Sequence, residues 1–133
     1  MTTQMTVQQA FEHTELWNTI GFEFIKGENG EAETALDFRP DLTNVAGTLH
    51  GGMMMTMLDN TMGIAAYTLG FDVVMTIQME TRFIRPVQAG RLRATAVTID
   101  RTRTTAILEG RIYNEDNQLI ALCTSTFKGV NHK

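Results

Sequence analysis

The segment from His50 to Leu69 constrains the fold more than any other part of the chain, because it is long and apolar on nearly every face. It carries one formal charge, Asp59, in about 20 residues, which as a helix would measure roughly 30 Å. A membrane span is the rival interpretation, but Asp59, Asn60, several threonines and a Gly-Gly pair argue against it. A helix that is apolar all round belongs in the interior of a soluble fold, so we expect one long buried helix.

The rest of the chain is typical of an antiparallel sheet with short connections. Asn29-Gly30 lies between two alternating segments and is the strongest hairpin signal in the sequence. A short amphipathic helix with Leu16 on its apolar face is predicted at residues 6–19, and strands at 21–27, 31–38, 73–83, 91–100, 103–113 and 118–127. The last connections allow only antiparallel hairpins. We therefore predict an α+β fold, in which an antiparallel sheet of about five to six strands wraps around one long central helix.

Composition places the chain among soluble intracellular proteins. Its 133 residues are 43% hydrophobic with a formal net charge of −4, so we expect one folded domain over residues 1–133 that does not bind nucleic acid. No signal peptide is visible, and the single Cys123 cannot form an internal disulfide, so the expected location is cytoplasmic. Histidine and cysteine lack metal-ligand spacing, and nucleotide-binding and serine-hydrolase motifs are missing. We expect no metal site.

The residues best suited to chemistry lie within the long apolar segment. A carboxylate among methionines, such as Asp59, is unfavourable unless it is paired, hydrogen-bonded or functional, and the helix offers no cation three or four positions away. Gly51 and Gly52 follow His50 at the helix start, where free N–H groups favour developing negative charge. The plainer alternative is that the two glycines only serve the turn and that His50 is a surface group at the helix start.

Two further groups of residues could contact a ligand. Seven arginines fall within residues 82–111, in an otherwise acidic protein, and their guanidinium groups suit phosphate or carboxylate; they could equally be solvated strand edges. The candidates for a phosphate site are Arg82, Arg85, Arg91 and Arg93. Seven of the nine methionines lie between Met53 and Met79, either as adaptable core filling or as the wall of an acyl or aryl pocket. Met54 and Met62 are the candidates for that wall.

The motif Asn44-Val-Ala-Gly-Thr-Leu-His-Gly-Gly, followed by Asp59 nine positions after His50 and then by Gly63, resembles the hotdog-fold thioesterases of the phenylacetic-acid-degradation type. The run from Met75 to Pro86 is also similar to that family, and the resemblance covers about residues 15–128. It extends to the hydroxybenzoyl-CoA-thioesterase-like members. The resemblance implies hydrolysis of acyl-CoA or aryl-CoA thioesters without a cofactor, in homodimers that commonly pair into tetramers.

The resemblance also implies roles for individual residues. Asp59 matches the acid that activates water as a general base or attacks the thioester carbonyl as a nucleophile. Gly51 matches the residue whose N–H polarises that carbonyl, with Gly52 beside the substrate. Asn44 and His50 match polar groups that orient substrate or water. Thr76 matches a hydroxyl that contacts the acid.

The spacing adds a geometric constraint to these roles. Nine residues of helix separate His50 from Asp59 by about 13–14 Å, so one helix cannot present both ends to one carbonyl. A two-fold partner running antiparallel could place its Gly51 beside this chain's Asp59, which predicts active sites shared between two chains. Two other functions stay open at this point: a hotdog acyl-thioester dehydratase, and a non-catalytic acyl-CoA binding or sensor module.

Overall fold

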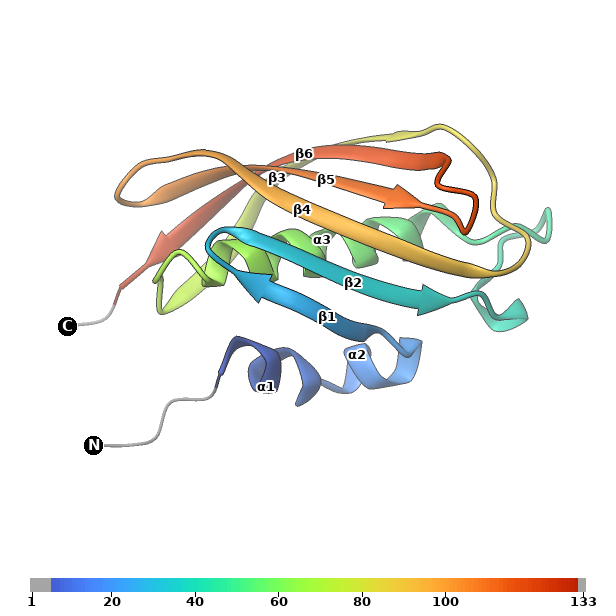
Figure 1. The fold of residues 1–133 in the computed structure, drawn as a ribbon, viewed down its shortest axis with the longest axis horizontal. Helices are drawn as coiled ribbons and strands as arrows, with labels where there is room; N and C mark the ends of the chain where they lie inside the picture. Colours follow the sequence, from blue (N-terminus) through green and yellow to red (C-terminus); the bar gives the residue numbers. More distant parts are fainter. Residues whose placement is uncertain (1–5, 132–133) are drawn as a thin grey trace.

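The computed structural model describes residues 6–131, and one long helix packed against a six-stranded sheet forms its centre (Figure 1). Helix α3 (Gly51–Tyr67) lies along the sheet, in which every strand is antiparallel to its neighbours in the order β1-β2-β4-β5-β6-β3. The strands are β1 (Glu23–Glu28), β2 (Glu31–Asp37), β3 (Val73–Phe83), β4 (Arg91–Arg101), β5 (Thr105–Tyr113) and β6 (Leu119–Val130). The predicted α+β architecture is confirmed.

The N-terminal segment forms two short helices where the sequence predicted one. Helices α1 (Val7–Glu12) and α2 (Glu15–Ile20) are separated at Thr14, which has an extended backbone and is the N-cap residue of α2. The Thr14 hydroxyl donates to the carbonyl of Phe11 at 2.9 Å and so closes α1. The break changes which side faces inward, because Trp17 and Ile20 are buried and Leu16 is exposed, contrary to the prediction.

The first hairpin follows the sequence signal closely. Asn29 and Gly30 have φ angles of 52° and 77°, the pair of positive values that a type I′ turn requires, and Glu28 pairs with Glu31 across it. This turn therefore sets the register of β1 and β2. After β2 the chain makes a single turn of 3-10 helix, η1 (Pro40–Leu42), and a loop that leads to α3.

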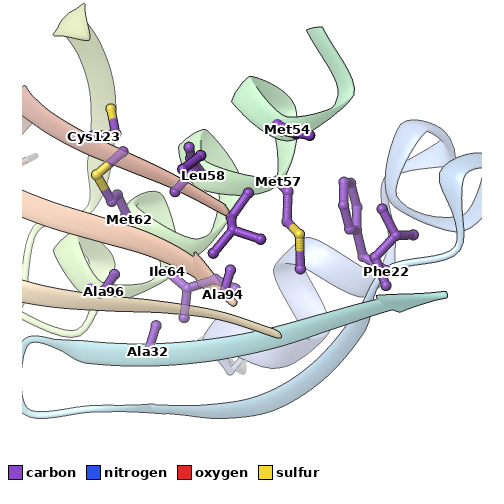
Figure 2. Close-up of a cluster of buried hydrophobic side chains, with 14 of the residues drawn as sticks. Phe22, Ala32, Met54, Met57, Leu58, Met62, Ile64, Ala94, Ala96 and Cys123 are labelled. Carbon is purple, nitrogen blue, oxygen red and sulfur yellow. The ribbon is translucent and has the colours of Figure 1, made fainter. Parts of the chain in front are cut away.

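The core lies between α3 and the sheet (Figure 2). Met57, Leu58, Met62 and Ile64 are fully buried, and burial of each such side chain contributes about 1.5–3 kcal/mol. The opposite flank of the helix, which includes Asp59, is only half-buried, so the expectation of a helix buried on every face is not met in this chain. No helix within residues 6–131 has both the length and the apolar character that a membrane span would need.

Strand β3 forms one edge of the sheet and is poorly covered. It pairs only with β6, and most of its residues are exposed. Met75, Ile77 and Phe83 have 49%, 58% and 52% of their surface exposed, which is high for large apolar side chains on one strand. An exposed edge of this kind has unpaired N–H and C=O groups and is suited to pairing with another strand.

Candidate active site

Asp59 and Thr76 form the most direct polar contact between α3 and the edge strand. The Thr76 hydroxyl donates a hydrogen bond of 2.6 Å to Oδ1 of Asp59. This bond fixes one carboxylate oxygen and leaves Oδ2 able to accept from another group. Asp59 is half-buried, and Thr76 is exposed in the single chain. The carboxylate is thus held in a defined orientation at the surface that β3 leaves uncovered.

A β-bulge in β3 is the reason that Thr76 faces the helix. Thr76 pairs with Phe127 and Gln78 pairs with Thr126, so Ile77 is an extra residue between two consecutive ladder pairs. Cross-strand partners share a face of the sheet, and Phe127 is buried on the helix side. Strict alternation would instead have placed Thr76 on the same face as Gln78. The bulge therefore delivers the hydroxyl to Asp59.

Of the two glycine N–H groups at the start of α3, one is hydrogen-bonded and the other is not. His50 is the N-cap, and its Nδ1 accepts the N–H of Gly52 at 2.9 Å. Met53 and Met54 donate their N–H groups to the carbonyl of His50. The Gly51 N–H belongs to the first turn, where no intrahelical acceptor exists, and no acceptor for it lies among residues 6–131. Gly51, rather than Gly52, therefore offers a free donor at the positive end of the helix.

Asn44 organises the loop that leads into α3. Its side-chain oxygen accepts from the N–H groups of Ala46 and Thr48 at 3.0 and 3.1 Å, and its amide nitrogen donates to the Thr48 hydroxyl at 2.9 Å. The Asn44 side chain is thus hydrogen-bonded within its own loop, and Nδ1 of His50 is hydrogen-bonded at the helix N-cap. In this chain both residues position the backbone around Gly51.

The structure brings the predicted residues together in two groups. Asp59 and Thr76 form one group, and Asn44, His50 and Gly51 form the other, with Gly52 beside it. Eight helical residues separate Gly51 from Asp59, which corresponds to about 12 Å along the axis of α3. That separation is too long for both groups of one chain to contact the same carbonyl.

A cavity of about 700 Å³ lies beside Asp59, between α1, α3 and the residues around β3. Asp59 and Thr76 are both on its wall. The other lining residues are Thr6, Val7, Ala10, Phe11, Thr14, Asn60, Gly63, Tyr67, Gly70, Phe71, Asp72, Val74 and Phe127. A carboxylate that is fixed by a hydroxyl at the side of a partly apolar cavity is suited to act on a small organic group held there.

Sequence reasoning missed most of this cavity. Gly63 and Tyr67 follow Asp59 at intervals of four residues, which places all three on one face of a helix. That spacing was visible in the sequence. The contribution of Phe11 was not, because it depends on how α1 packs across α3.

The methionines predicted to line an acyl pocket lie elsewhere. Met54 and Met62 are 3% and 0% exposed, and neither lines the cavity. Both belong to the buried core between α3 and the sheet (Figure 2). The Ser125 hydroxyl donates to the Met62 sulfur at 3.1 Å. Cys123 is also in the core, and burial raises the pKa of its thiol, which disfavours the nucleophilic thiolate.

Two of the four candidate arginines form ion pairs or a ring contact within the chain. Arg91 forms ion pairs with Glu23 and Asp37, and the hydrogen bonds that its guanidinium donates to both carboxylates raise its pKa. Arg93 lies over the ring of Tyr113, 4.7 Å from the centroid. These two arginines tie β4 to its neighbours.

The other two arginines lie at and just after the end of β3. Arg85 donates to the carbonyl of Leu119 at 2.6 Å. Arg82 is exposed, and its side chain has no hydrogen bond, ion pair or ring contact within the described part of the chain. Arg82 is therefore the member of the set that is most available to an anionic ligand.

Comparison with known proteins finds a family model and a relative that each match more than half of the chain. A family model described as the thioesterase superfamily matches residues 46–121, which is more than half of the chain. The 1,4-dihydroxy-2-naphthoyl-CoA hydrolase of Listeria monocytogenes is 29% identical over 117 residues, covering 85% of this chain and 95% of that protein.

Solved structures are similar over nearly the whole chain. A thioesterase family protein from Silicibacter pomeroyi superposes with a TM-score of 0.89 at 25% identity, covering 95% of this chain and 96% of that one. A mutant of the phenylacetic acid degradation protein from Thermus thermophilus superposes with a TM-score of 0.83 at 28% identity, covering 88% and 100%. The resemblance drawn from the sequence is confirmed, and the chain belongs to the thioesterase superfamily with its hotdog fold.

Proposed function

We propose that the protein hydrolyses acyl-CoA or aryl-CoA thioesters to the free acid and CoA, with Asp59 acting at the thioester carbonyl. The observation that carries this proposal is the Asp59 carboxylate, fixed by Thr76 beside a cavity of about 700 Å³. Membership of the thioesterase superfamily supports a thioesterase activity in general. The Listeria relative is named as a hydrolase of a CoA thioester, which supports CoA as the leaving group.

The chemistry can follow either of two routes. As a general base, Asp59 takes a proton from water while the water oxygen adds to the carbonyl carbon. The tetrahedral intermediate then collapses and the C–S bond breaks. The proton that Asp59 took from water passes to the sulfur, so CoA leaves as the thiol and Asp59 is again a carboxylate. As a nucleophile, Asp59 itself displaces CoA, and water hydrolyses the mixed anhydride. In both routes negative charge develops on the carbonyl oxygen and needs a hydrogen-bond donor.

We propose that this donor is the N–H of Gly51 of the partner subunit in a two-fold dimer. The separation of about 12 Å along α3, from helix rise, prevents one chain from supplying both groups. Strand β3 offers an open edge with exposed apolar residues, which is suited to pairing with its own copy. An antiparallel pair of β3 strands would place the two α3 helices side by side in opposite directions, with the start of each near Asp59 of the other.

The direct test is a panel of acyl-CoA and aryl-CoA esters, scored by release of free CoA with a thiol-trapping reagent. We expect catalytic release for at least one class of ester. A pure binding module would bind the esters without releasing thiol, and a dehydratase would alter the acyl chain while the thioester stays intact. Either result would contradict the proposed hydrolysis.

Arg82 is proposed to hold the phosphate groups of CoA, because it is the candidate arginine whose side chain has no partner in the described chain. Arg82→Ala should raise KM for CoA esters several-fold and change KM for the matching pantetheine ester, which lacks those phosphates, much less. Steady-state kinetics on the two esters measures the difference.

Arg91→Ala is the matched control. Arg91 is engaged by Glu23 and Asp37, and such exposed pairs contribute about 0.2–1 kcal/mol each to stability. We expect a small loss of Tm and an unchanged ratio of the two KM values. Equal effects of Arg82→Ala on both esters would contradict a phosphate contact.

A further inference from the structure

The cavity beside Asp59 follows one face of α3. Asp59, Gly63 and Tyr67 are spaced four residues apart, and all three line the cavity. From helix rise, Gly63 lies about 6 Å and Tyr67 about 12 Å along the axis from Asp59. A group attached to a carbonyl at Asp59 therefore has a path along the helix, with Gly63 halfway.

Gly63 lies beside two aromatic rings, with room for about one carbon atom between them. A Cβ at this position would lie 3.5 Å from the Phe11 ring and 3.7 Å from the Phe127 ring, which is ordinary van der Waals contact. A methyl group would thus fit without displacement and would contact both rings, whereas a larger side chain needs more room than the gap between the rings gives. Glycine inside a helix costs about 0.5–1 kcal/mol relative to alanine. Gly63 therefore weakens the helix, although an alanine at this position would meet no steric clash.

Helix α1 supplies the wall opposite Gly63. Thr6, Val7, Ala10, Phe11 and Thr14 line the cavity, yet α1 itself has no buried residue. The Phe11 ring packs edge-on against Tyr67 and Trp17, with centroid distances of 5.8 and 5.9 Å. The aromatic contacts of Phe11 therefore define the width of the cavity at the level of Gly63.

We propose that Gly63 and Phe11 together determine the length of the acyl group that the site accepts. This inference rests on the proposed thioesterase function. The acyl chain extends from Asp59, passes between Phe11 and Phe127 over Gly63, and ends near Tyr67. Chains of about four carbons end before Gly63, whereas chains of about six to ten carbons occupy the space above it, given the axial distances along the helix. The predicted substrates are medium-length acyl-CoA esters.

The test is a comparison of kcat/KM for acetyl-, butanoyl-, hexanoyl-, octanoyl- and decanoyl-CoA in wild type, Gly63→Ala and Gly63→Leu. Gly63→Leu should leave the two short esters within about threefold of wild type and lower the octanoyl and decanoyl values by about tenfold or more, because each methylene excluded from an apolar pocket costs about fourfold. Gly63→Ala should raise Tm and reduce only the long-chain values, by a smaller factor.

A second variant separates cavity filling from damage to the helix. Phe11→Ala opens the opposite wall, so the double variant Gly63→Leu with Phe11→Ala should recover at least part of the octanoyl activity. Leu16→Ala removes an exposed apolar residue of α2 that does not line the cavity, and its chain-length profile should match wild type.

The outcomes distinguish this inference from the function it rests on. A loss confined to long chains, with recovery in the double variant, supports it. An equal loss at all chain lengths, with or without a fall in Tm, would show that Gly63 serves the helix and would overturn the chain-length role while leaving the thioesterase function intact. If wild type released CoA from aryl-CoA esters but from none of these straight-chain esters, the chain-length role would fail while the thioesterase function stood. Release of CoA from neither class would contradict both.

Discussion

Asp59→Asn is expected to lower the turnover of the preferred CoA ester by about 100-fold to 10,000-fold, the range that a general base contributes, while the fold and oligomeric state stay unchanged. Asparagine has nearly the same shape, and its side-chain oxygen can still accept the hydrogen bond from Thr76. It cannot take a proton from water or attack a carbonyl. The measurements are kcat by thiol release, Tm by thermal unfolding and mass in solution.

Variants at Thr76 provide the matched control for this result. Thr76→Ser keeps the hydroxyl that orients the Asp59 carboxylate and should retain most of the activity. Thr76→Val has the same shape but no donor, so we expect an intermediate loss in kcat. Turnover close to wild type in Asp59→Asn would exclude Asp59 from the chemical step under either route.

Mixed dimers of two inactive variants are expected to regain about a quarter of wild-type activity. One variant carries Asp59→Asn. The other carries Gly51→Pro, which removes only the proposed donor, because proline is well tolerated at the first position of a helix. The backbone of His50, at φ −62° and ψ 133°, suits a residue that precedes proline. Each variant alone should be nearly inactive.

The expected value follows from the shared site. In a mixed dimer both lesions fall in one site and the other site is intact, and random reassociation makes about half of the dimers mixed. Gly51→Ala is the control for Gly51→Pro. It keeps the N–H, and its added methyl group contacts the Phe83 ring only at ordinary distance, so this variant should be active by itself without mixing. Subunit exchange is verified by mass measurements on differently tagged chains. No recovery despite complete exchange would show that each site lies within one chain.

The fold could be predicted because local signals and the global pattern agree. The Asn29-Gly30 turn specifies one hairpin without reference to the rest of the chain. The apolar segment that became α3 is too long for a strand and too polar for a membrane span. Thr14 was the exception, because a single N-cap residue interrupts an otherwise helical pattern. The apolar spacing continues through Thr14, so periodicity alone does not predict that the helix ends there.

The site was less predictable, since its parts depend on packing between distant segments. Asp59 stood out as a lone charge, and the Gly-Gly pair marked the start of a helix. The cavity was invisible, because its far wall comes from Phe11 on a helix that packs across α3. The clustering of methionines left two interpretations of Met54 and Met62, core filling or an acyl pocket, and helix geometry directs both side chains to the sheet. Arginine ion pairs such as Arg91 with Asp37 join residues 54 positions apart, which composition cannot indicate.

The bulge in β3 has a consequence for how such sites are found in other proteins. Within β3, Ile77 is the residue without a ladder partner between two paired positions, and the bulge is needed only because Ile77 is present. A strand without this residue could keep Thr76 paired with Phe127 and present the hydroxyl to Asp59 with no bulge. Two related strands, one with the bulge residue and one without it, would therefore differ by one in the number of residues between this threonine and the end of the strand. A search based on fixed spacing would overlook chains with the shorter strand, whereas one based on cross-strand partners would recover them.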